Sequence, residues 1–154
     1  MTSLPTATAL RRVGGLAIAA GSLFVAAGAG AWFTVSKQLR AEKIEVPGNA
    51  PALAGKPVQG PATAYVEALV IQRNAERGAG GRTFADISNA LRGVDGSSDE
   101  AAELRKQSAA LSTAAALRTS LMTSVLAYGV SAFAAGLGAL LLVIGSQLRR
   151  ARAE

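Results

Sequence analysis

The sequence predicts a mainly α-helical membrane protein. Its two antiparallel transmembrane helices would form a long helical hairpin, joined to a small extracytoplasmic cap of helices and short strands. Three observations predict this fold class. Two long runs contain no charged residue, basic residues flank both runs toward the chain ends, and the segment between the runs alternates helical patterns with turns rich in Pro and Gly.

The first charge-free run, residues 13–36, is the first predicted transmembrane helix. About 20 apolar residues in a helix span the hydrocarbon core of a bilayer. Trp32 and Phe33 lie near the end of the run, where aromatic side chains favour the interface. An alternative stays open, because the preceding arginines, the apolar core and the small residues 27–31 also resemble a secretory signal with a cleavage site. The run continues past those small residues, which favours a retained span.

The second run, residues 119–148, predicts a second transmembrane helix. In lipid every backbone polar group must be satisfied within its own segment, so each run is expected to be helical. Cytoplasmic flanks of membrane helices are enriched in Lys and Arg. We therefore expect a protein of the cell (cytoplasmic) membrane with cytoplasmic tails at residues 1–12 and 149–154 and an extracytoplasmic segment at residues 37–118. The residues that set this topology are Arg11, Arg12, Arg149, Arg150 and Arg152.

The segment between the runs is expected to fold as the cap. The stretch "KIEV" alternates apolar and polar residues, a strand signal. Pro61 suits the first turn of a helix, Thr83 can cap another helix, and Ser97 and Glu100 have the spacing of a capping box. The predicted elements are short strands at about 43–46 and 56–59, and helices at about 62–77, 84–91 and 98–118, the last continuing into the second span.

Two sets of residues are expected to make the packing contacts. Small residues at every fourth position let helices approach closely in lipid, although spans this rich in Ala and Gly also produce such ladders by chance. In the membrane the set is Ser22, Ala26, Gly30, Ser131, Ala132, Ala135, Gly136 and Ala139. In the cap, apolar residues at helical spacing form the second set: Tyr65, Leu69, Phe84, Leu104 and Leu111.

No set of residues in the sequence indicates catalysis. The chain contains no His and no Cys, which excludes His or thiolate metal sites, His general bases and Ser-His-Asp triads. The stretch "GAGG" follows no predicted strand and lacks the Lys of a phosphate-binding loop. The basic clusters flank apolar runs, which favours a membrane over a nucleic-acid partner. We therefore predict no catalytic, cofactor or metal site and no nucleic-acid binding.

Several short motifs occur in order between residues 44 and 138: "IEV", "AGKPVQGPATAY", "GGRTFADI" and "LRTSLMTSV", then "GV" at Gly129 and "GLG" at Gly136. Together they resemble a family of small two-span membrane proteins from actinobacteria, whose pattern has His at Asn74, Lys at Arg82 and Tyr at Phe84. The resemblance implies two spans and an outer cap, and no established activity. The family often carries the name aromatic ring-opening dioxygenase. That name conflicts with this chain, because such enzymes hold iron with His and carboxylate ligands.

These observations favour a non-enzymatic integral membrane protein. Its expected role is an accessory or assembly subunit of a larger membrane complex, with the lipid bilayer and other membrane proteins, or further copies of itself, as partners. The alternative is a protein that binds a lipid or a small ligand where the cap meets the bilayer, around Tyr65, Trp32 and Tyr128.

Overall fold

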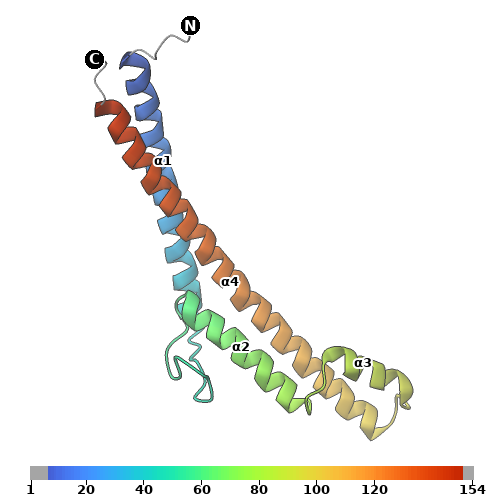
Figure 1. Cartoon of the computed structure of the whole chain (residues 1–154). Helices are drawn as coiled ribbons and strands as arrows, with labels where there is room; N and C mark the ends of the chain where they lie inside the picture. The colour runs from blue at the N-terminus through green and yellow to red at the C-terminus, as the bar shows by residue number, and fades with distance from the viewer. Residues whose placement is uncertain (1–6, 151–154) are drawn as a thin grey trace. The chain divides into compact units, whose positions relative to one another are not determined.

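A computed structural model describes residues 7–150 of the chain and is mainly helical (Figure 1). Helices α1 and α4 are each long and apolar enough to cross a membrane. The chain divides into two compact units, and α4 contributes to both. We call residues 7–36 with 127–150 unit 1, and residues 37–126 unit 2. The four helices are α1 (Ala7–Ala41), α2 (Pro61–Gly78), α3 (Phe84–Gly93) and α4 (Asp99–Arg150).

Unit 1 consists of α1 and the last part of α4, packed antiparallel (Figure 1). The contact is lined by small residues that recur every seven positions on each helix, the repeat typical of helices packed as a coiled coil. A Cβ at Gly21 would lie 2.7 Å from the carbonyl oxygen of Gly138 and 3.0 Å from the nitrogen of Leu142. The two backbones therefore touch. The facing pairs are Gly14 with Gly145, Gly21 with Gly138, and Gly28 with Ser131.

Unit 2 has a core of aliphatic side chains from three helices. Ile87 of α3 and Leu104 of α4 are 0% and 4% exposed, and they pack with Leu111 and Ala79. Helix α3 begins after Thr83, whose Oγ1 accepts a hydrogen bond from the Asp86 nitrogen at 3.3 Å. The Thr83 nitrogen and hydroxyl donate in return to Asp86 Oδ2, at 2.8 and 2.7 Å, and these two bonds to the carboxylate lower the pKa of Asp86.

The two predicted strands of the cap are wrong. Within residues 7–150 the segments near 43–46 and 56–59 form only an isolated antiparallel bridge between Glu45 and Pro57. The Val46 nitrogen donates to the Lys56 oxygen at 2.9 Å, and the Val58 nitrogen to the Ile44 oxygen at 2.8 Å. The pairing ends there because the Lys56 nitrogen donates to the Leu53 oxygen at 3.0 Å, and the Val46 oxygen accepts from the Gly55 nitrogen at 2.8 Å. Val46 and Val58 nevertheless anchor the segment, since each is only 1% exposed.

The start of α4 also differs from its predicted cap. Ser98, not Ser97, accepts a hydrogen bond on its Oγ from the Ala101 nitrogen at 3.1 Å. Ser97 instead donates its backbone N–H and its hydroxyl to Asp95 Oδ1, at 2.9 and 2.8 Å. These two bonds lower the pKa of Asp95 and fix the turn before the helix.

Candidate functional site

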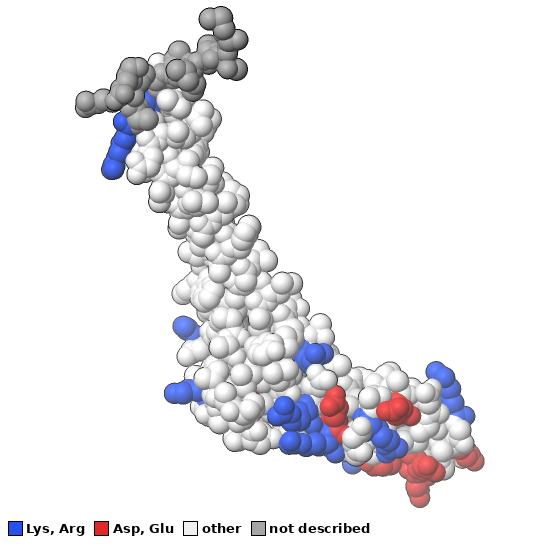
Figure 2. Space-filling view, viewed as in Figure 1, with Lys and Arg blue, Asp and Glu red and all other residues white. Residues whose placement is uncertain are grey.

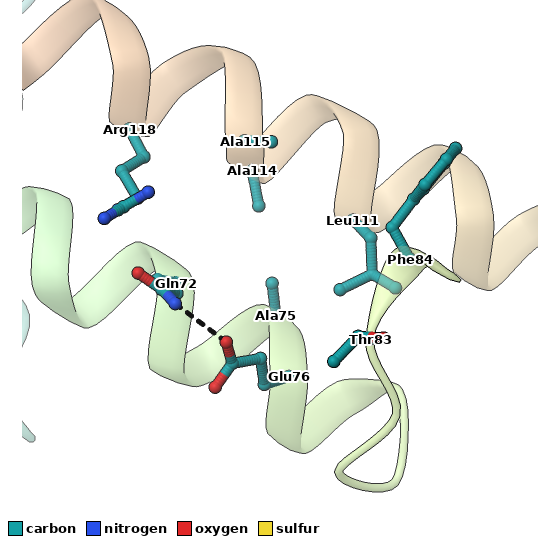
Figure 3. Close-up of a pocket in the computed structure, with 9 residues that line it drawn as sticks. All are labelled: Gln72, Ala75, Glu76, Thr83, Phe84, Leu111, Ala114, Ala115 and Arg118. Atoms are coloured by element: carbon teal, nitrogen blue, oxygen red, sulfur yellow. Dashed lines mark hydrogen bonds between the residues drawn. The ribbon is translucent and has the colours of Figure 1, made fainter. Parts of the chain in front are cut away.

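Unit 2 has a groove between α2 and α4, beside the start of α3 (Figure 3). Its volume is about 160 Å³, and apolar groups make up most of its wall. For scale, an apolar cavity of about 150 Å³ holds one benzene ring. The lining residues are Gln72, Ala75, Glu76, Thr83, Phe84, Leu111, Ala114, Ala115 and Arg118.

One end of the groove is polar. Gln72 donates its Nε2 to Glu76 Oε1 at 2.9 Å, which holds both side chains on α2. Arg118 extends from α4 toward Gln72, across the groove from the ring of Phe84 (Figure 3). Arg118 Nε is buried and donates no hydrogen bond within the described chain. A buried donor without an acceptor costs free energy, so this end of the groove favours an acceptor or an anion.

Glu67 is a second buried polar group in unit 2. It is 5% exposed, and its Oε2 accepts no hydrogen bond from any residue between 7 and 150. Burial disfavours the charged carboxylate and therefore raises the pKa of Glu67. The sequence predicts Tyr65 and Leu69 on the buried face of this helix, α2. The structure buries Ala64, Glu67, Ala68 and Val70 instead.

Unit 1 contains a small polar cluster inside the helix contact. Tyr128 is 1% exposed, and its hydroxyl shares a hydrogen bond of 2.8 Å with Ser36 Oγ. The ring of Trp32 stands edge-on to that of Tyr128, with centroids 4.6 Å apart. Ser131, 3% exposed, donates its hydroxyl to the Ala127 carbonyl at 2.8 Å. The Tyr128–Ser36 bond and the ring contact with Trp32 join α1 to α4, whereas Ser131 bonds within α4.

The predicted membrane ladders lie at two kinds of position. Ser131 and Ala135 are in the α1–α4 contact, where a Cβ on Gly28 would lie 2.6 Å from the Ser131 oxygen and 2.8 Å from the Ala135 nitrogen. The other members are exposed, and a Cβ on Gly30 or Gly136 would meet no atom within 4 Å. The exposed members are Ser22, Ala26, Gly30, Ala132, Gly136 and Ala139.

The structure also separates the residues predicted to pack the cap. Leu104 and Leu111 are buried in the core of unit 2, and Leu69 is partly buried. Tyr65 and Phe84 are about half exposed, at 48% and 51%. The alternative ligand site grouped Tyr65 with Trp32 and Tyr128. The latter two contact each other in unit 1, and Tyr65 belongs to unit 2.

The contact of unit 1 uses glycines that the four-residue search missed. Gly14, Gly21 and Gly28 are spaced by seven residues, as are Gly138 and Gly145. A search at the seven-residue period would have found them in the sequence.

Of the residues predicted to set topology, Arg11, Arg12, Arg149 and Arg150 are exposed at one end of unit 1. Arg152 lies outside the described residues.

Comparison of the chain with protein-family models, curated proteins and solved structures finds no match. Within residues 7–150, no three side chains of His, Cys, Asp or Glu gather where they could hold a metal ion.

Proposed function

We propose that the chain is a non-enzymatic integral membrane protein that serves as an accessory or assembly subunit of a larger membrane complex. In this proposal α1 and the apolar part of α4 cross the membrane, both chain ends are cytoplasmic, and residues 37–118 form an extracytoplasmic cap. The resemblance to the actinobacterial two-span proteins is part of the same proposal.

The observation that carries the proposal is the second row of small residues. The contact within unit 1 uses Gly14, Gly21 and Gly28 and leaves Ser22, Ala26 and Gly30 of α1 exposed. In lipid, helices gain no hydrophobic free energy by associating. Close approach of their backbones at small residues is therefore a main driving force for association in a membrane. The exposed row provides that approach for a helix of another subunit or of a second copy.

The test compares two exposed small residues of α1. Gly30→Leu fills the row, whereas Ala20→Leu places the same side chain at an exposed alanine outside the row. We expect the tagged chain, extracted in mild detergent, to elute with bound partner or as an oligomer. Gly30→Leu should release a single copy, and Ala20→Leu should not. The proposal fails if the unmutated chain elutes alone at every detergent concentration.

The groove of unit 2 supports a second candidate function, the binding of a small amphipathic anion. Its apolar wall fits a ring or a short alkyl chain, and the unpaired Nε of Arg118 fits a carboxylate. This moves the proposed ligand site from Tyr65, Trp32 and Tyr128 to the α2–α4 groove.

Calorimetric titration of the full chain with octanoate tests binding in this groove. Arg118→Gln should abolish the heat of binding, and the exposed Arg73→Gln should preserve it. Equal heats for both variants would refute the site.

A further inference from the structure

Unit 1 carries all of its described charges at one end. They are Arg11 and Arg12 of α1 and Arg149 and Arg150 of α4, and residues 7–36 and 127–150 include no Asp or Glu. Figure 2 shows basic side chains at this end and an uncharged visible face along the two helices beyond it. The cations therefore have no acidic partner within the described part of unit 1.

Three of these arginines line one hollow. Arg11, Arg12 and Arg149, which we call the arginine cluster, surround it together with Thr8 and Gly15, and its volume is about 470 Å³. The four lining residues of α1 have the i, i+3, i+4, i+7 spacing of one helix face. The cluster thus combines side chains from both helices around a single space.

The glycine contact brings Arg149 to the cluster. A Cβ on Gly14 would lie 2.8 Å from Arg149 Cγ and 3.1 Å from its nitrogen. The aliphatic part of the Arg149 side chain therefore lies against the backbone of α1 at Gly14, within one helical turn of Arg11 and Arg12. A larger side chain at position 14 would push it away.

The electrostatics at this end are unbalanced. The three guanidinium groups repel one another, and the first turn of α1 has no acidic residue to complement the positive end of the helix dipole. Arginine remains charged at any physiological pH, so the repulsion cannot be relieved by loss of a proton. An anion bound in the hollow would relieve it.

We propose that the arginine cluster binds the phosphate group of an anionic phospholipid. The inference rests on the proposed membrane location. Arg12 directly precedes the first apolar run and Arg149 directly follows the second, so the guanidinium groups lie at the level of the lipid phosphates. Guanidinium binds phosphate oxygens with paired hydrogen bonds. The proposed topology puts the cluster in the cytoplasmic leaflet, the anionic one.

The experiment counts bound lipid by native mass spectrometry. The full-length chain, purified in neutral detergent, is titrated with phosphatidylglycerol or with phosphatidylcholine. We expect phosphatidylglycerol to be retained and phosphatidylcholine to be lost. Each basic residue near an anionic surface contributes roughly fivefold to binding, so the triple variant R11Q/R12Q/R149Q should weaken retention by roughly a hundredfold.

Two variants control for bulk charge. R73Q/R77Q/R92Q removes three exposed arginines of unit 2 and should leave the lipid preference intact. R11K/R12K/R149K keeps the charge and loses the guanidinium fork, so it should bind with intermediate affinity. Far-UV circular dichroism verifies that every variant is folded.

Several outcomes would overturn the proposal. They are equal retention of the two lipids, an equal loss in the unit 2 control, full retention by the lysine variant, and displacement of the lipid by inorganic phosphate or by an RNA oligonucleotide. Failure of the membrane proposal looks different, because the chain would then be recovered without detergent in the soluble fraction.

Discussion

The two units of this chain pack the same helix by different means. In unit 1, α4 meets α1 through glycine, backbone against backbone, and large apolar side chains such as Leu23 and Phe133 are exposed, at 71% and 73%. In unit 2, α4 buries Leu104 and Leu111 against α2 and α3. Burial of aliphatic side chains stabilises contacts in water, and glycine contacts are typical of helices in lipid. The change along α4 supports the proposal that unit 2 lies in water and unit 1 in lipid.

The largest expected effect comes from the core of unit 2. Ile87 is fully buried, and truncating such a side chain to Ala costs about 2–5 kcal/mol. Ile87→Ala should speed hydrogen exchange across α3 and the facing part of α4. The fluorescence of Trp32, the only Trp and a residue of unit 1, should not change. A matching change in Trp32 fluorescence would show that the units unfold together and would break the comparison.

The next largest effect is expected at the glycine contact of unit 1, where a buried and an exposed glycine can be compared. A Cβ at Gly21 overlaps the Gly138 oxygen, so Gly21→Ala should destabilise unit 1 by about 1–3 kcal/mol. Gly30→Ala meets open space and should be neutral, or stabilising by up to about 1 kcal/mol. Unfolding by added SDS, followed by Trp32 fluorescence, measures both. Equal midpoints for the two variants would contradict the contact.

The hydrogen bond in unit 1 contributes less. Tyr128→Phe removes the hydroxyl bonded to Ser36 and should cost about 1 kcal/mol. Tyr65→Phe is the control, because Tyr65 is half exposed in unit 2. The same SDS titration measures both variants. A Tyr128→Phe midpoint identical to that of the unmutated chain would show that the hydrogen bond to Ser36 does not stabilise unit 1.

The smallest effect is a pH dependence confined to unit 2. The folded-state pKa of Glu67 is raised above its ordinary 4.5, so the folded state binds the proton more tightly than the unfolded state. The resulting stability is present below pH 4.5 and is lost as the pH rises through the folded pKa. At pH 7 the backbone amides of unit 2 should therefore exchange more slowly in Glu67→Gln than in the unmutated chain. The stability of unit 2 should also depend less on pH in this variant. An unchanged pH profile would contradict burial of the charge.

Much of the fold could be predicted because it depends on local patterns. Charge-free runs determine where α1 and α4 are apolar, and Thr83 marks the start of α3. The burial of Glu67 could not be predicted, since the face that α2 buries depends on how its neighbours fit against it. The two strands did not form because the turn between them uses the next backbone groups, with Lys56 bonded to Leu53 and Gly55 to Val46. The glycines of the unit 1 contact were missed because small residues were sought at every fourth position, whereas these glycines recur at every seventh.

The most direct test of the account is cysteine labelling in intact cells, because the chain has no Cys of its own. Single cysteines at Ser97 in unit 2, at Leu23 in unit 1 and at Ser3, outside the described residues, are treated with a membrane-impermeant maleimide. We expect Ser97→Cys to react in intact cells, Ser3→Cys only after permeabilisation, and Leu23→Cys in neither. An intact mass of the extracted chain shows whether the first span is retained. Labelling of Ser97→Cys only after permeabilisation would contradict the account.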